Sequence, residues 1–492
     1  MTNKLFATTV LLGVIKTSIL FSQNPPPQSM FGRITAHSQV NGAWDDGQIQ
    51  TMNQIRDAAL HDSYAYDQLS FLSNNIGARP SGSPEAEAAI ERVASELRSL
   101  GAEVTLEKTT VPHWIRGEES AALTMWTGMT PGTTQKVVVT ALGSSPSTSP
   151  TGLVAPVVVI DSFDQLNAKP AGSLRGKIVL FNHPFDKELT AAGHAIDAYA
   201  QSAVYRAIGP STASRLGAVA VIVRSVGGED FRLPHTGSTV FEKDVTPIPA
   251  AAVTSEDADL IAFVAQQGPV VMRLTLTPKN LPSAEGYNVI ADWKGSQHPE
   301  QIVLVSGHLD SWDLGTGALD DGAGIVIGME TIQLLHTLNL HPKRTIRFVA
   351  WMNEELGATG AATYVADHAA DMTNHIAAIE SDRGADHPFG IIFNGPSALA
   401  DYLSPVARTL EPINANLVLN EEEIGEDVAR IMAKGVPGIC SAQDMRRYFN
   451  YHHSAADTLD KVDRRQLAEN AAVISAVTFA LADAEEPAPR MQ

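Results

Sequence analysis

The stretch QIVLVSGHLDSWDLGTGALDDGAGIVIGMETIQLL, residues 301–335, decides the fold that this sequence predicts. The run QIVLVS at its start is typical of a buried strand, and GAGIVIGMETIQLL at its end has the length and composition of a buried helix. Between these runs, residues 308–321 contain four aspartates and one histidine. Carboxylates this dense between two buried elements must be hydrated, paired or bound to a cation.

The alternation of strands and helices continues on both sides of this stretch. NVIADWKG (288–295), RTIRFVAWMN (344–353) and HIAAIESD (375–382) are strand-like, and GATGAATYVADHAADM (357–372) is helical. Nearer the N-terminus, SPEAEAAIERVASELRSLG (83–101) has a serine cap, a proline in its first turn and a terminal glycine, and a strand-like run follows it. This alternation predicts an α/β fold with a mostly parallel central sheet and helices on both faces.

Residues 128–280 have a different composition. Gly, Pro, Ser and Thr separate short β-rich runs there, and one helix near 198–216 interrupts them. The runs are KVVVTAL, LVAPVVVI, GKIVLFN, AVAVIVRS, PIPAAAVT and VVMRLTL. We therefore expect a β-rich module inserted into an α/β domain whose own two segments are 45–127 and 281–485.

Composition narrows the class of protein. A chain of 492 residues with 44% hydrophobic and 18% charged residues suits two or three folded domains. The formal charge of −20 argues against nucleic acid or an anionic membrane as a partner, because both attract a basic surface. Cys440 is the single cysteine, so no intrachain disulfide can form.

Residues 1–22 resemble a secretory signal peptide. Lys4 precedes the apolar run LFATTVLLGVI, and the Pro-rich NPPPQ follows. A membrane anchor or an unstructured start is the alternative, because Lys16 interrupts the apolar region. No later apolar run approaches the roughly 20 residues that span a bilayer. We therefore expect a secreted or periplasmic protein that has no membrane contact after signal removal.

Acidic residues and a histidine gather at one edge of the predicted sheet. His308 and Asp310 follow one strand, Glu354 and Glu355 follow another, and Asp382 ends a third. The carboxyl ends of parallel strands line the crevice in which ligands bind. Crowded carboxylates repel one another unless a cation neutralises them. Oxygen and imidazole ligands together favour zinc, with manganese or cobalt as substitutes.

Other site motifs do not fit this sequence. It contains no H-E-x-x-H and no G-x-S-x-G, so a single-helix zinc protease and a serine hydrolase of the usual kind are unsupported. Trp312 and Leu314 occupy positions that a calcium-binding loop needs for ligands. Asp320 stands where a dinucleotide-binding loop would have its third glycine.

Five short motifs, all in family order, resemble those of the co-catalytic di-zinc aminopeptidases and their carboxypeptidase Q-like branch. They are GHLDS (307–311), ALDDGAG (318–324), NEELG (353–357), ESD (380–382) and HHSAADT (452–458). The resemblance implies the zinc exopeptidase fold, with 45–127 and 281–485 as the two segments of a peptidase domain. It also implies that the insert, 128–280, is the protease-associated domain that this family often carries.

The resemblance implies two zinc ions per chain, both bound by a bridging Asp320. His308 and Asp382 would complete the protein ligands of one ion. Glu355 and His453 would complete those of the other. His453 is chosen because it fits the family pattern H-x-x-x-[DE]-T, whose last two positions are Asp and Thr in this sequence.

The same resemblance implies the remaining roles. Glu354 would be the general base that activates a metal-bridging water, and Asp310 would orient the imidazole of His308. The implied reaction is the hydrolysis of dipeptides or other short peptides that have a free amino end. Relatives include homodimers, so a homodimer is a further expectation.

Several neighbouring residues have two interpretations. His452 would either donate to the oxyanion of the tetrahedral intermediate or be an exposed neighbour of a ligand. Arg383 would either pair with a substrate carboxylate or balance the acidic site. Asp313 and Asp321 match no ligand position, so solvent exposure or hydrogen bonds to the backbone are expected for them. Cys440 is expected to be a small buried residue.

Two other functions use the same fold. A single-zinc aminoacyl cyclase reorganises the second metal site, and a non-catalytic, receptor-like binding protein loses metal ligands. The complete set of five ligands and a base in this sequence disfavours both alternatives. The metal content per chain would separate the cyclase from the peptidase.

Overall fold

The stretch that opens with QIVLVS forms a strand, a loop and a helix, as predicted. The computed structural model describes residues 44–228 and 231–491. In it, strand β11 (His298–His308) leads through a loop into the short turn η4 (Ala318–Gly322) and helix α10 (Ala323–Thr337). The helix is almost completely buried, in keeping with its apolar composition.

The described residues divide into two compact units, of which the larger consists of 44–116 and 279–491. Its strands, besides β11, are β1 (Glu103–Ile115), β10 (Lys279–Trp293), β12 (Arg344–Trp351), β13 (His375–Glu380), β14 (Pro388–Asn394), β15 (Leu417–Asn420) and β16 (Gly438–Gln443). Within the described residues they form one eight-stranded sheet in the order β1-β10-β12-β11-β13-β16-β14-β15.

The central strands of this sheet are parallel and its flanks are largely antiparallel. β12, β11, β13 and β16 pair in parallel. The pairs β1–β10, β10–β12 and β16–β14 are antiparallel, and β14–β15 is again parallel. The predicted α/β architecture is confirmed, while the sheet predicted to be mostly parallel is mixed, with parallel pairing confined to the centre and to one edge pair.

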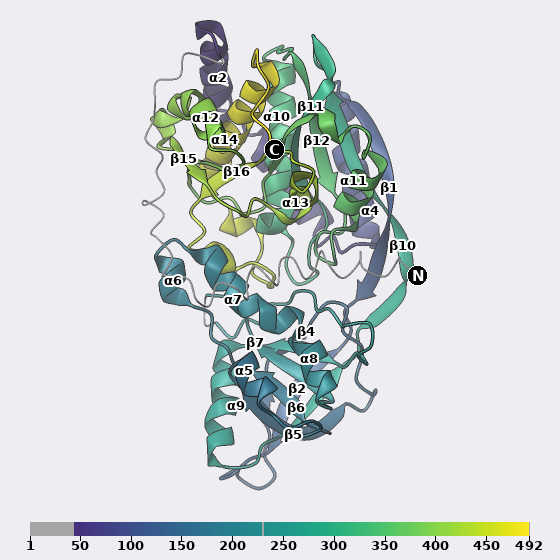
Figure 1. Ribbon diagram of the computed structural model, residues 1–492. Helices are drawn as coiled ribbons and strands as arrows, with labels where there is room; N and C mark the ends of the chain where they lie inside the picture. The colour runs from purple at the N-terminus through teal and green to yellow at the C-terminus, as the bar shows by residue number, and fades with distance from the viewer. Residues whose placement is uncertain (1–43, 229–230, 492) are drawn as a thin grey trace, which may run out of the picture. The chain divides into compact units, whose positions relative to one another are not determined.

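Helices cover both faces of the sheet. Helix α10 connects β11 to β12, and α11 (Thr359–Asp367) connects β12 to β13, on the other side of β11. The connection from β11 to β12 and the connection from β12 to β13 run in opposite directions across the sheet. Because such crossovers are right-handed, they put α10 and α11 on opposite faces. Helix α14 (Arg464–Asp483) packs beside α10 (Figure 1). Helix α11 contacts β1 and α13 (Glu426–Met432).

The direction of these crossovers reverses between β11 and β13. At such a switch point the connections leave in opposite directions, and a crevice opens at the carboxyl ends of the two strands. All residues of β13 and all but one of β12 are buried, as expected for strands that are covered on both faces. The crevice therefore sits at the end of a rigid, fully packed layer.

The remaining helices surround this core. Helix α4 begins as predicted, because the Ser83 side chain accepts a hydrogen bond from the N–H of Ala86 and Pro84 occupies the first turn. The helices are α2 (Asp46–Ala59), α3 (Tyr64–Phe71), η3 (Leu72–Ile76), α4 (Pro84–Ser99), η5 (Met372–Asn374), α12 (Ala398–Thr409), η6 (Glu411–Ile413), η7 (Tyr448–Asn450) and η8 (Leu459–Lys461).

The second unit, Gly117–Pro278, has its own sheet and apolar core. Its strands are β2 (Glu119–Met125), β3 (Gln135–Val137), β4 (Val139–Ala141), β5 (Leu153–Ile160), β6 (Ile178–Phe181), β7 (Ala220–Arg224), β8 (Ala250–Val253) and β9 (Val271–Leu276). In the described part of the chain their order is β3-β2-β9-β5-β6-β7-β8-β4. Its helices are α5 (Phe163–Asn167), α6 (Lys187–Ala191), α7 (Ala195–Ala207), α8 (Gly209–Arg215) and α9 (Ser255–Gln267).

The helices of this unit correct the sequence prediction in two respects. Two helices, α7 and α8, replace the single helix expected near 198–216, because Pro210 starts a new helix rather than continuing one. Helices α5, α6 and α9 are additional. Thr254 caps α9 by accepting from the N–H of Asp257, so a start signal was present in the sequence.

The predicted signal peptide, residues 1–22, lies outside the described residues. Within the described residues, no helix combines the length and the apolar character needed to cross a membrane. The predicted location, secreted or periplasmic, stays a prediction.

Candidate metal centre

The predicted metal ligands come from five separate segments that meet at the crevice. His308 is the last residue of β11, and Asp382 comes two residues after the end of β13. Glu355 lies in the turn after β12, and Asp320 lies in η4. His453 follows η7. The strand ends and turns therefore bring together side chains that are far apart in the sequence.

The two carboxylate oxygens of Asp320 face different histidines. Its Oδ1 lies 3.2 Å from Nε2 of His308, and its Oδ2 lies 3.2 Å from Nε2 of His453. Nε2 of His308 is also 3.7 Å from Oδ1 of Asp382. Nε2 of His453 is also 3.0 Å from Oε2 of Glu355. The five side chains thus form two groups that share one carboxylate.

Burial and mutual repulsion dominate the electrostatics of the site. Burial is the largest cause that raises the pKa values of Glu354, Glu355 and Asp382, and neighbouring carboxylates raise them further. Burial also pushes the pKa of Asp320 upward, but the surrounding histidines hold it well below its usual range. A divalent cation at the site would stabilise the ionised form of all four carboxylates.

These donors fit a metal ion. Donor atoms of His308, Asp320 and Asp382 lie within 4.8 Å of one another. Oε1 of Glu355 is buried and, among the described residues, has no hydrogen-bond partner. A buried carboxylate oxygen without a donor is costly unless a cation binds it. Imidazole nitrogens combined with carboxylate oxygens are a donor set that suits zinc.

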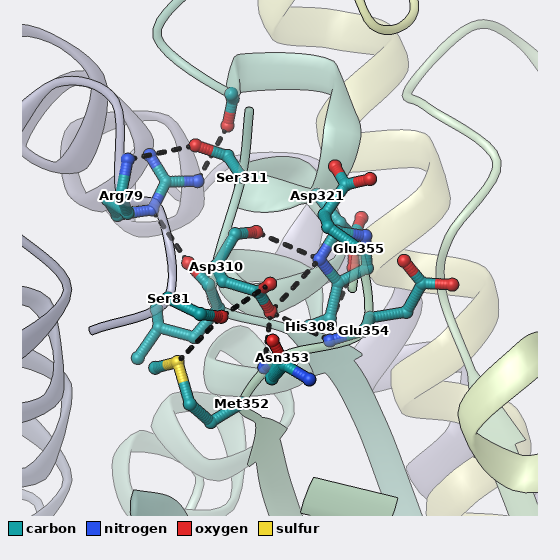
Figure 2. Close-up of polar contacts among 12 residues, drawn as sticks. Arg79, Ser81, His308, Asp310, Ser311, Asp321, Met352, Asn353, Glu354 and Glu355 are labelled. Carbon is teal, nitrogen blue, oxygen red and sulfur yellow. Dashed lines mark hydrogen bonds and ion pairs between the residues drawn. The ribbon is translucent and has the colours of Figure 1, made fainter. Parts of the chain in front are cut away.

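Asp310 supports the site differently from the prediction. Nδ1 of His308 lies 2.9 Å from the backbone carbonyl oxygen of Asp310 and 3.9 Å from its carboxylate, so the main chain orients the imidazole. The carboxylate Oδ1 accepts instead from the backbone N–H groups of Asn353 (2.7 Å) and Glu354 (3.0 Å), as Figure 2 shows. Asp310 therefore fixes the main chain of Glu354, whose side chain groups with Glu355 and His308.

Comparison with known proteins identifies this arrangement. The model of peptidase family M28 matches residues 288–478. Carboxypeptidase Q from Bos taurus is 39% identical over 428 residues, which are 87% of this chain and 87% of that protein. The solved structure of a peptidase M28 precursor from Shewanella amazonensis is 36% identical, with a TM-score of 0.85, and covers 91% of this chain and 100% of that one. The chain belongs to peptidase family M28.

A second solved structure shares the fold of this M28 peptidase at lower similarity. BSAP, a zinc aminopeptidase from Bacillus subtilis, is 19% identical with a TM-score of 0.62, and covers 87% of this chain and 97% of that chain. Family membership makes the protein a metallopeptidase. The predicted resemblance to carboxypeptidase Q is confirmed.

Asp457 holds the backbone at the candidate metal site of the M28 peptidase, a role that the motif pattern alone did not reveal. Its Oδ1 accepts from the N–H groups of Ala318 (3.0 Å) and Leu319 (2.7 Å), and its Oδ2 accepts from the N–H of Asp320 (3.2 Å). The carboxylate therefore fixes the main chain that carries Asp320. The available signal was the position of Asp457 in HHSAADT, but its partners cannot be read from that motif.

The two remaining aspartates of residues 308–321 have distinct partners. Asp321 is buried and accepts from the backbone N–H groups of His308 and Gly324, both at 3.0 Å, so the expected backbone hydrogen bonds are present. Asp313 forms a two-pronged ion pair with Arg116 at 2.7 and 2.8 Å. The prediction for Asp313 was therefore wrong: its partner is neither solvent nor backbone but the side chain of Arg116, which directly follows β1.

The structure separates the two residues predicted to bind substrate. His452 is buried and stacks on His453 with ring centroids 3.6 Å apart, and its Nε2 lies 3.6 Å from Oδ2 of Asp320. Arg383 is also buried, but its Nη2 donates to the carbonyl oxygen of Glu423 at 2.7 Å. His452 therefore belongs to the cluster, whereas the guanidinium of Arg383 is bound to a neighbouring segment. Cys440 is buried, as expected.

Proposed function

We propose that this peptidase is a di-zinc exopeptidase that hydrolyses dipeptides or other short peptides. The observation that carries the proposal is the carboxylate of Asp320, whose two oxygens face two different histidine–carboxylate pairs. His308 and Asp382 would hold one ion. Glu355 and His453 would hold the other, with Asp320 shared. Bound zinc supplies a water whose pKa lies near neutrality.

Glu354 would be the general base for that water. It lies beside the ligands, and Asp310 fixes the main chain from which its side chain extends toward His308 and Glu355. The carboxylate takes a proton from the attacking water and returns a proton to the leaving amine. His452, stacked on His453, would donate to the oxyanion that forms at the substrate carbonyl.

Dipeptides are a substrate class that fits the activities for which both relatives are named. Carboxypeptidase Q is named for removal of the carboxyl-terminal residue, and BSAP for removal of the amino-terminal residue. In a dipeptide, both activities act on the same single bond. The acidic site would also attract the free α-amine of a short peptide.

We also propose that Gly117–Pro278 is a protease-associated domain inserted into the peptidase domain. Two observations support this assignment. The unit has a sheet and a core of its own, and the chain enters it after β1 and leaves it before β10.

The test combines metal analysis with a dipeptide-library assay. Protein stripped by a chelator should be inactive and should regain dipeptide hydrolysis as zinc is added, up to two ions per chain. Asp320→Ala should lose both ions together, whereas Asp382→Ala should lose one. Stepwise loss of a single ion from the Asp320 variant would overturn the bridge. Saturation at one ion per chain would favour the cyclase alternative.

A further inference from the structure

Arg79 is a buried arginine whose guanidinium donates its hydrogen bonds to main-chain carbonyl groups (Figure 2). The acceptors are the carbonyl oxygens of Leu309 (2.8 Å), Thr316 (2.8 Å), Gly317 (2.9 Å) and Gly77 (3.0 Å). The first three lie in loop 309–317, which connects His308 to the turn that carries Asp320. One side chain therefore binds both ends of the loop that separates a ligand of one proposed zinc ion from the proposed bridge.

The main chain of Arg79 binds the same loop. Its N–H donates to the hydroxyl of Ser311 at 3.0 Å, and its carbonyl oxygen accepts from the N–H of Ser311 at 3.2 Å. The loop and Arg79 are in close contact at Gly317, whose φ is 58°. A Cβ added at this glycine would lie 2.4 Å from Cβ of Ser311 and 2.8 Å from Nη2 of Arg79. The loop has no room to shift toward Arg79.

The charge of Arg79 suits this position. Burial lowers the pKa of its guanidinium, while four surrounding aspartates, Asp457, Asp310, Asp321 and Asp320, act in the opposite direction. Burying a charge is costly, and here the aspartates offset part of that cost. The planar guanidinium can reach several carbonyl groups in fixed directions, whereas the single ammonium of a lysine cannot.

Ser81 extends the same support to the proposed base. Its hydroxyl donates to Oδ2 of Asp310 at 3.0 Å. The other oxygen of that carboxylate accepts from the N–H groups of Asn353 and Glu354. Segment 77–81 therefore contacts both the metal-site loop and, through Asp310, the main chain of Glu354. It lies outside residues 288–478, which the family model matches.

We propose that Arg79 and Ser81 are positioning residues of the catalytic site. Arg79 sets the distance between His308 and Asp320 by holding loop 309–317 at both ends. Ser81 orients the carboxylate of Asp310, which in turn fixes the main chain of Glu354. The inference rests on the proposed di-zinc function. It predicts that the two residues control different quantities, zinc affinity for Arg79 and turnover for Ser81.

The test compares Arg79→Lys and Ser81→Ala with two matched controls. Arg344→Lys is the control for Arg79, because Arg344, the first residue of β12, is also a buried arginine. Its guanidinium donates to the carbonyl oxygens of Ala484 and Glu485. Ser475→Ala is the control for Ser81, because its buried hydroxyl contacts Thr331 between α10 and α14. Both controls remove buried hydrogen bonds away from the site.

Zinc affinity, from competition with a chelator, and kcat and KM for a dipeptide are the readouts. Arg79→Lys should weaken zinc binding by about 10–100-fold, the usual effect of losing a residue that supports metal ligands. Ser81→Ala should keep its zinc and its KM and lose about tenfold in kcat. Arg344→Lys and Ser475→Ala should lower the melting temperature but leave zinc affinity and kcat unchanged.

Two results of the zinc-affinity and kinetic measurements would overturn the proposal. One is wild-type zinc affinity in Arg79→Lys together with wild-type kcat in Ser81→Ala. The other is an equal loss of zinc affinity in Arg344→Lys, which would trace the effect to general destabilisation. Hydrogen exchange of loop 309–317 gives a readout that is independent of zinc, and it should accelerate in Arg79→Lys alone. A wild-type protein that binds no zinc would refute the proposed function, whereas unchanged exchange would refute the positioning role.

Discussion

At the scale of single residues, the buried aspartates of the site fall into two kinds. Asp310, Asp321 and Asp457 each accept hydrogen bonds from at least two backbone N–H groups, so their carboxylate oxygens have donors within the protein. Asp320 instead faces imidazole nitrogens on both sides. The carboxylates that hold the backbone thus have donors in the main chain, whereas the shared carboxylate of Asp320 is the one proposed to bind the cations. Asp320 and Asp321 are adjacent and identical in type, so composition alone cannot tell them apart.

Glu354→Gln should abolish most turnover without removing metal. The amide cannot accept a proton from water, so kcat should fall by about 10²–10⁴-fold. The main-chain hydrogen bond to Asp310 does not involve the substituted side chain, so the position of residue 354 should be kept. The neighbouring Glu355→Gln is the contrast, because it should lower the zinc content. Steady-state kinetics with metal analysis separate the two, and an active Glu354→Gln would contradict the base assignment.

Glu330 on α10 makes stability depend on pH. It is 1% exposed, and burial raises its pKa from 4.5 to about 8. Between these values the unfolded chain loses a proton that the folded protein keeps, so stability falls as pH rises through this window. The total loss is roughly 4–5 kcal/mol, complete by about pH 8. Glu330→Gln keeps an acceptor for the N–H of Ala65 and should remove this decline.

The measurement is urea unfolding at several pH values between 4.5 and 8.5. The difference in unfolding free energy between Glu330→Gln and the wild type should grow in favour of the variant across this range. Glu91→Gln, at an exposed position of α4, is the control and should show no such trend. A constant difference for Glu330→Gln would show that the buried carboxyl group does not titrate as proposed.

At the scale of elements, the site depends on how loops meet at the strand ends. β11, β12 and β13 were predictable because each is an apolar run bounded by polar residues. The contacts between their loops were not, since Arg79 and Leu309 are 230 residues apart in the chain. Nor did the sequence predict β16, whose buried Ser441 has its hydroxyl paired with Asn470 of α14. Tertiary partners make such a polar strand acceptable inside the core.

Asp457→Asn should loosen η4 and weaken zinc binding. The amide keeps one acceptor for the backbone of Ala318 and Leu319 but turns a donor toward the N–H of Asp320. Because Asp320 is the proposed bridge, the affinity for both ions should fall by about tenfold. Asp460→Asn is the control on the same segment, since its side chain is 71% exposed. Chelator competition on both variants checks this, and equal affinities would contradict the role of Asp457.

At the scale of the whole molecule, the division into two units reflects the pairing of β1 with β10. Their antiparallel register ends with Ile115 opposite Lys279, so the chain leaves and re-enters the larger sheet at adjacent points. Composition alone indicated a module at 128–280, whereas the compact unit spans Gly117–Pro278. The earlier start is explained by β2, which pairs with β9 inside that unit. Pairing partners, which composition does not show, determine where a unit begins.

Replacing Gly117–Pro278 with a short turn containing Asn-Gly should leave a folded metallopeptidase unit. β1 and β10 would then form an ordinary hairpin, for which this dipeptide provides a favourable turn. All the proposed zinc ligands and their supporting residues lie in 44–116 and 279–491, so the zinc content should match that of the full chain. Circular dichroism on heating should show one cooperative transition. A shortened chain that folds cooperatively but binds no zinc would show that the removed unit contributes to the site, whereas failure to fold would show that the larger unit depends on it for stability.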